Sequence, residues 1–262
     1  MSVVLLDNET VHYEVLGRGR PVMFLHGWVG SWRYWIPAMQ AASGQYRSYG
    51  LDFWGFGDTS HQPDRYEISN QLQLLESFLE ELGIGKIALV GHGLGAVVGL
   101  LFAHEHPDRV DRLLAVSLPL AGNRINPRFR LSSPGELTDW LLGVSPEHEA
   151  ARAETPKADP LAIQGSMEGI AGLDVSSLFQ KSTTPRLLVY GSNDAAVYPP
   201  GEAELLGLPS EAHMIPFTQS SHFPMLDERN QFNRLLMDFL ALGSGESPQS
   251  LSIKEEWKRR VR

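Results

Sequence analysis

The chain has 262 residues, enough for one large domain or two small ones with a sizeable core. Hydrophobic residues make up 42% and charged residues 20%, which is ordinary for a globular protein and excludes an intrinsically disordered chain. The net charge of −9 argues against nucleic acid or an anionic membrane as the main partner, and no apolar run is long enough to span a bilayer.

The chain contains no cysteine, which excludes disulfides and thiolate metal sites. Its N-terminal stretch has no basic region before the first apolar residues and turns acidic at residue 7, which argues against a signal peptide. Together these features predict a cytoplasmic protein.

Strand-like apolar runs alternate with segments of helical spacing along most of the chain. In chain order, the predicted elements are a hairpin at residues 3–6 and 11–16, a strand at 21–25, a helix that begins after Ser31, a strand at 46–51, a helix at 69–82, a strand at 87–90, a helix at 96–104, strands at 112–117, 185–190 and 212–217, and a last helix at 231–240. This alternation predicts an α/β fold, a mostly parallel sheet with helices on both faces.

Residues 119–184 interrupt the alternation. They are rich in Pro, Gly, Ser and Asn, with short helical candidates at 135–142, 146–153 and 160–169. A connection this long is seldom structureless in a compact domain, so we interpret it as a helical lid inserted between two strands. The predicted division is a core at 1–118 and 185–243 and a lid at 119–184.

Six residues follow predicted strands directly, at the edge where ligands bind in parallel sheets. They are His26, Asp52, Gly93, Ser117, Asp194 and His222. We expect them to share one rim of the sheet.

Five short motifs then identify a family. They are FLHGW at 24–28, LDFWGFGDTS at 51–60, LVGHGLG at 89–95, LLVYGSNDAAV at 187–197 and SSHFPMLDERNQF at 220–232. In this order, the motifs resemble those of α/β-hydrolases of the cap-bearing esterase, epoxide hydrolase and haloalkane dehalogenase type, across roughly residues 3–242. The resemblance implies an α/β-hydrolase fold with a helical lid.

The resemblance also implies roles for individual residues. His222 matches the family's general base and Asp194 its catalytic acid, which would hold the imidazole in one tautomer. The backbone N–H groups of Trp28 and Leu94 match the two oxyanion-hole donors. No cofactor motif and no metal-ligand spacing stands out, so we expect a small apolar ligand or substrate and no cofactor or metal.

One position departs from the family pattern. The central residue of the G-x-S-x-G nucleophile turn is Gly93, which has no side chain to attack a substrate. A residue at this turn is held in a strained backbone conformation that glycine adopts freely.

Three interpretations of Gly93 stay open. The protein could be an active hydrolase or lyase of a carbonyl or ester-type substrate, with the His222–Asp194 pair as general base and a water in the space that Gly93 leaves. It could instead be a non-catalytic pseudo-hydrolase, acting as a ligand-binding or protein-interaction module. Finally, it could be a serine esterase whose nucleophile has been replaced by glycine.

The C-terminal residues 244–262 differ in composition from the body. Gly243 to Pro248 predicts a flexible linker, and the rest carries a net positive charge, unlike the acidic body. Ile253, Trp257 and Val261 would form one apolar stripe on a helix. We therefore expect Trp257 to be buried against protein, either in this chain or in a partner.

Overall fold

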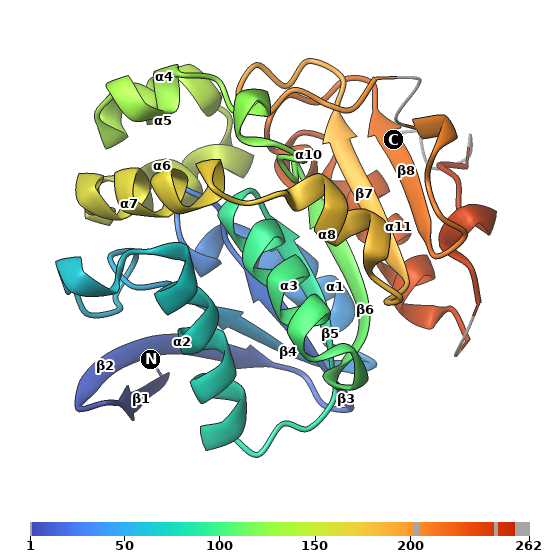
Figure 1. The fold of residues 1–262 in the computed structure, drawn as a ribbon, viewed down its shortest axis with the longest axis horizontal. Helices are drawn as coiled ribbons and strands as arrows, with labels where there is room; N and C mark the ends of the chain where they lie inside the picture. Colours follow the sequence, from blue (N-terminus) through green and yellow to red (C-terminus); the bar gives the residue numbers. More distant parts are fainter. Residues whose placement is uncertain (1, 202–204, 244–245, 255–262) are drawn as a thin grey trace.

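The computed structural model describes residues 2–201, 205–243 and 246–254. Eight strands form one sheet in the order β1-β2-β4-β3-β5-β6-β7-β8 (Figure 1). β1 pairs antiparallel with β2 and β2 with β4, whereas all other neighbours are parallel. The strands are β1 (Ser2–Leu6), β2 (Glu9–Leu16), β3 (Arg20–Leu25), β4 (Tyr46–Leu51), β5 (Ile87–His92), β6 (Val110–Val116), β7 (Arg186–Gly191) and β8 (Ala212–Phe217).

The N-terminal hairpin shows how local sequence sets a turn. Asp7 and Asn8 join β1 to β2, and both have positive φ angles, 50° and 66°. Two consecutive residues in this region are the signature of the tight turn that matches the twist of paired strands. The predicted hairpin is therefore present, with its turn at two residues rather than four.

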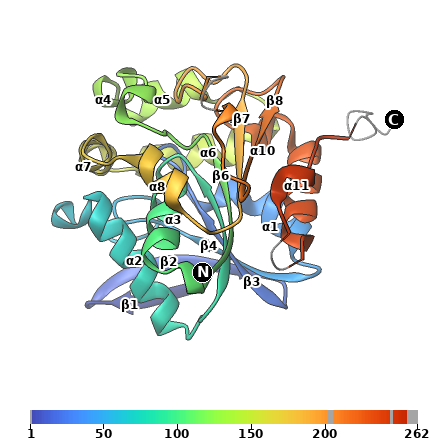
Figure 2. The same cartoon turned by 45° about the vertical axis from the view of Figure 1, so that its right-hand side comes forward.

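Helices cover both faces of the sheet. α1 packs against α11 on one face, while α2, α3 and α8 pack side by side on the other (Figure 2). Outside the β6–β7 connection, the described residues form α1 (Ile36–Ala42), α2 (Ile68–Glu81), α3 (Leu94–Glu105), α10 (Pro224–Asp227) and α11 (Arg229–Ala241), among other short elements. The α/β-hydrolase fold predicted from the sequence is confirmed.

The connection between β6 and β7 is helical. It contains α4 (Arg128–Leu131), α5 (Pro134–Leu141), α6 (Glu149–Glu154), α7 (Pro160–Ala171) and α8 (Val175–Lys181). α4 to α7 lie together at one end of the molecule, beyond α2 and α3 (Figure 1), and α8 packs against α3 in the helical layer. We call residues 119–174 the inserted segment.

The chain returns to the body after α11. The Pro248 side chain is buried, and Leu251 and Ile253 pack against the hydrophobic core. His213 Nε2 lies 3.1 Å from the Leu251 carbonyl oxygen. Trp257 and the stripe predicted around it lie outside the described residues. Among the helices described, none combines the length and apolar character needed to cross a bilayer.

Candidate functional site

The turn between β5 and α3 has the geometry of a nucleophile elbow. Gly93 stands before the first residue of α3 with φ 49° and ψ −108°, and its N–H donates to the Val116 carbonyl oxygen at 2.9 Å. A side chain on Gly91 or Gly95 would collide with backbone, in the second case with that of Leu25. Glycine is therefore required on both sides of the turn by close packing and favoured at its centre by the positive φ.

The space above Gly93 is occupied by a ring. A Cβ atom built on Gly93 would lie 2.9 Å from Trp28 Cζ3 and 3.1 Å from Trp28 Cε3. The expectation that Gly93 leaves room for a water beside it is therefore wrong in this conformation. The indole of Trp28 fills the place where a nucleophile side chain would start.

His222 and Asp194 form a buried pair after β8 and β7. His222 Nδ1 lies 3.0 Å from Asp194 Oδ2 and 3.2 Å from Oδ1. With Nδ1–H donating to the carboxylate, the neutral ring carries its lone pair on Nε2. His222 Nε2 has no hydrogen-bond partner among the described residues. This nitrogen can therefore accept a proton from a bound molecule.

Asp194 is held by several other donors. Its Oδ1 accepts from the N–H groups of Ala196 at 2.8 Å and Val197 at 3.0 Å, and its Oδ2 accepts from Ser117 Oγ at 2.8 Å. Burial would raise the pKa of Asp194, but His222 and these hydrogen bonds outweigh it and lower the pKa to about 2. The carboxylate is therefore ionised at neutral pH and can stabilise a protonated His222.

Two peptide N–H groups stand at the same edge of the sheet. Leu94 is the first residue of α3 and Trp28 follows β3, and neither N–H donates to another described residue. An N–H at a helix N-terminus is available to an anion because it has no intrahelical acceptor. These two groups are suited to bind the oxygen of a polarised carbonyl.

A hydrogen-bonded chain links three loops of the site. The Gly27 N–H donates to Tyr34 Oη at 2.6 Å, and Tyr34 Oη lies 3.0 Å from His92 Nδ1. His92 Nε2 lies 3.0 Å from the His222 carbonyl oxygen. Burial lowers the pKa of His92 well below its ordinary value, so the ring is neutral and accepts from Tyr34 while donating to His222. The loop after β3, the turn at Gly93 and the loop that carries His222 are thus joined.

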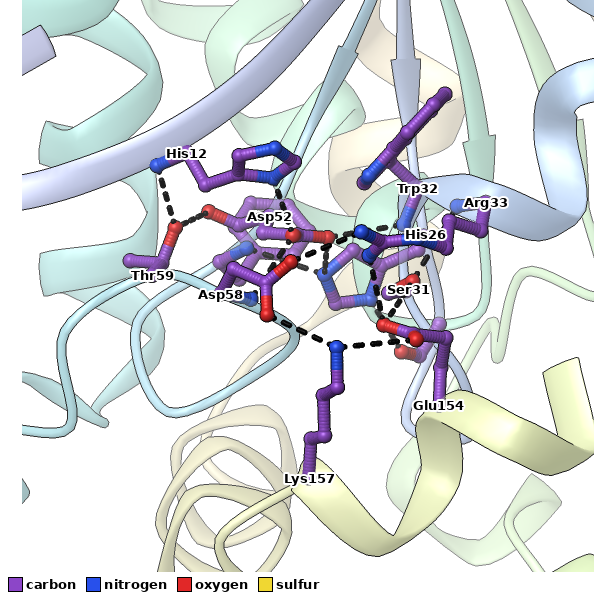
Figure 3. Close-up of polar contacts among 12 residues, drawn as sticks. His12, His26, Ser31, Trp32, Arg33, Asp52, Asp58, Thr59, Glu154 and Lys157 are labelled. Atoms are coloured by element: carbon purple, nitrogen blue, oxygen red, sulfur yellow. Dashed lines mark hydrogen bonds and ion pairs between the residues drawn. The ribbon is translucent and has the colours of Figure 1, made fainter. Parts of the chain in front are cut away.

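Asp52 and His26 hold loops beneath the site (Figure 3). Asp52 accepts from the N–H groups of Trp32 at 2.9 Å and Asp58 at 3.2 Å, and lies 2.8 Å from His12 Nδ1. His26 Nε2 accepts from a backbone N–H of the loop after β4 at 3.1 Å. His12, Asp52 and Asp58 bring ligand-type atoms within 4.8 Å of one another, but the Asp52 oxygens already accept these hydrogen bonds.

The inserted segment is tied to the core by charges (Figure 3). Arg33 lies 2.8 Å from Glu154 and 3.0 Å from Asp58, and Lys157 lies 2.9 Å from Asp58. Glu154 also accepts from Ser31 Oγ at 3.2 Å. Both Ser31 and Arg33 follow Trp28 closely in sequence, so the segment is anchored beside the loop after β3.

The inserted segment also covers the site with residues that carry no sequence signal. The Phe129 ring of α4 lies 5.9 Å from His222 and 5.4 Å from Trp28, measured between ring centroids. Trp28 Nε1 donates to Ser166 Oγ of α7 at 3.1 Å. Phe129 and Ser166 belong to no motif, and only their position in an insertion next to the rim points to them.

Family membership follows from comparison with known proteins. Residues 20–158, more than half of the chain, match the alpha/beta hydrolase fold family. The chain belongs to the α/β-hydrolases. A putative carbamate hydrolase RutD from Yersinia enterocolitica is 23% identical over 94% of this chain and 97% of its own length.

Two further relatives show the breadth of this family. The pimeloyl-acyl-carrier-protein methyl ester esterase of Vibrio cholerae is 22% identical over 87% of this α/β-hydrolase and 97% of its own length. The solved structure of a hydrolase from Pseudomonas aeruginosa matches with a TM-score of 0.81 at 17% identity, covering 92% of this chain and 98% of that one. At this low identity, the structural similarity shows that the two proteins share a fold.

Proposed function

We propose that this α/β-hydrolase cleaves a small ester or carbamate-type carbonyl compound without a covalent intermediate. The observation that carries the proposal is the open Nε2 of His222, backed by an ionised Asp194, on the same sheet edge as the two unbonded N–H groups of Trp28 and Leu94. Relatives named as carbamate hydrolase and methyl ester esterase support this substrate class.

In the proposed reaction, His222 Nε2 removes a proton from water as the water oxygen bonds to the carbonyl carbon. The carbonyl oxygen gains the negative charge and is stabilised by the N–H groups of Trp28 and Leu94. The tetrahedral intermediate then collapses, and the protonated His222 donates its proton to the leaving alkoxide or amine. Asp194 stabilises the imidazolium between the two proton transfers.

The absence of a nucleophile limits the expected rate. Removing the serine of a catalytic triad lowers the rate by roughly 10⁶-fold, and the oxyanion hole with substrate binding retains roughly 10³–10⁴-fold over water. General-base catalysis contributes typically about 10²–10⁴-fold. A water-based enzyme is therefore expected to be slow on unactivated esters and best on small substrates that fit next to His222.

A second candidate is a binding protein without chemistry. The placement of the Trp28 indole over Gly93 favours it, because the ring lies where a nucleophile side chain would begin. In that case the residues around His222 serve to hold a ligand or a protein segment, and His222 serves only to order its loop.

The test is a set of steady-state assays on the intact protein with p-nitrophenyl acetate, methyl acetate and methyl carbamate. Wild type should hydrolyse at least one of them, His222→Gln should lose this activity, and Asp194→Asn should lower it strongly. Hydrolysis that does not depend on His222 refutes the proposal, and a complete lack of turnover favours the binding protein.

A further inference from the structure

We infer that the Trp28 side chain restricts the substrate to a very small group on the carbonyl carbon, such as methyl or the amino group of a carbamate. This inference rests on the proposed function, and it adds a specificity-determining residue to it. It begins from the fixed position of the indole above Gly93, with Cζ3 2.9 Å and Cε3 3.1 Å from a Cβ built there.

The indole is fixed at its polar end. Trp28 Nε1 donates to Ser166 Oγ at 3.1 Å, and that hydroxyl lies 2.7 Å from the Ala162 carbonyl oxygen in the same helix. The Ser166 hydrogen is thus directed into α7, which leaves a lone pair for the indole N–H. Both residues are fully buried, so breaking this bond would leave a buried donor without an acceptor.

The indole is also enclosed on its apolar side. Phe129 packs against it with ring centroids 5.4 Å apart and then against His222 at 5.9 Å. Trp28, Phe129 and His222 each expose no more than 1% of their surface. The Trp28 and Phe129 rings therefore form a continuous aromatic wall from Gly93 to His222. Because α4 and α7 hold the indole, it moves only if one of these helices moves as well.

The backbone of Trp28 ties this wall to the chemistry. A carbonyl oxygen bound by the N–H groups of Trp28 and Leu94 would place its carbon above the elbow, where the Trp28 ring begins. Each added methylene on that carbon would have to displace the ring. Trp28 thus supplies both an oxyanion donor and a limit on the acyl group.

The test compares chain lengths in variants of Trp28. We would measure kcat/KM for p-nitrophenyl acetate and hexanoate, and the binding of acetamide and hexanamide by calorimetry. The variants are Trp28→Leu, Trp28→Phe and Ser166→Ala, which removes only the hydrogen bond that holds the indole. Melting temperatures show which variants fold, and Trp28→Phe keeps the test valid if Trp28→Leu does not.

Wild type should prefer acetate, and Trp28→Leu should shift the acetate-to-hexanoate ratio towards hexanoate by at least about 10-fold, since one methylene in a fitted pocket changes selectivity about 10–200-fold. Trp28→Phe and Ser166→Ala should both lie between the two, because the first keeps part of the ring and the second releases the whole ring from its hydrogen bond. Hexanamide should bind Trp28→Leu at least about 10-fold more tightly than wild type.

An unchanged chain-length ratio in folded Trp28→Leu overturns the inference and leaves the proposed function intact. If wild type hydrolyses no ester, the proposed function fails and the amides alone decide. Tighter hexanamide binding in Trp28→Leu then still supports a size limit set by Trp28. Equal hexanamide binding by wild type and Trp28→Leu, or no hexanamide binding by either, overturns the size limit.

Discussion

Two of the buried histidine–aspartate pairs in the described part of the chain differ in their surroundings. His222 lies 3.0 Å from Asp194, and His12 lies 2.8 Å from Asp52. Each carboxylate also accepts from two backbone N–H groups. By distance and burial alone, either pair could be taken for a general base with its orienting acid.

Within the residues that the structure describes, neither histidine has a hydrogen-bond partner at Nε2, and the surroundings of this nitrogen separate the pairs. His12 projects from the middle of β2, and its Nε2 is buried 3.6 Å from the Glu14 carboxylate. His222 follows β8 at the edge where the Trp28 and Leu94 N–H groups have no acceptor among the described residues. A histidine–aspartate pair thus becomes a candidate base only where donors for a developing oxyanion stand beside it.

The largest expected contrast is between the two histidines. His222→Gln should lower kcat/KM for p-nitrophenyl acetate by about 10²–10⁴-fold, because it removes a base. His12→Gln should leave kcat/KM within a few-fold and lower the melting temperature. The contrast is measured by determining kcat/KM and the melting temperature of both variants. Equal losses of kcat/KM in the two variants would show that His222 has no special catalytic role.

Asp52, the partner of His12, should contribute to the stability of the fold. Asp52→Ala leaves the buried donors of Trp32 and His12 without an acceptor. Each such donor costs about 1–3 kcal/mol, so we expect the free energy of unfolding to fall by at least about 2 kcal/mol. Urea unfolding measures this. A loss below about 1 kcal/mol would show that the loop does not depend on Asp52.

The glycine at the elbow should resist a side chain. Gly93→Ala places a Cβ at φ 49° and against Trp28, and should destabilise the fold by about 1–3 kcal/mol. Gly135→Ala is the control, because α5 is an ordinary helix there and nothing lies within 4 Å of the added Cβ. In this control, the free energy of unfolding should rise by about 0.5–1 kcal/mol. Similar effects of both changes would argue against a strained elbow.

The pH dependence of stability should report Asp194. Its pKa of about 2 in the folded protein lies below the ordinary value of 3.8, so the carboxylate stabilises the fold above about pH 4. This contribution, about 2 kcal/mol, is lost as the pH falls through 2. Asp194→Asn should therefore show a shallower loss of unfolding free energy between pH 4 and pH 2. If the free energy of unfolding of both proteins falls equally between pH 4 and pH 2, the lowered pKa of Asp194 is contradicted.

Most of the sheet and part of the candidate site could be predicted from the sequence. The parallel strands were predictable because their apolar runs are buried on both faces, as in β5, and the elbow because its glycines are spaced as in the family motif. α4 and α8 escaped prediction, since a helix of four or seven residues shows little periodicity. The position of the Trp28 ring was also beyond reach, because it depends on Ser166, 138 positions away.

The most direct test of a water-based mechanism is the pre-steady-state release of p-nitrophenolate from p-nitrophenyl acetate. Wild type should release it linearly from the first turnover, because Gly93 offers no oxygen to acylate. Gly93→Ser is the matched comparison and should give a burst if the added hydroxyl reaches His222. A burst in wild type equal to the enzyme concentration would reveal an acyl-enzyme and contradict the proposed direct attack by water.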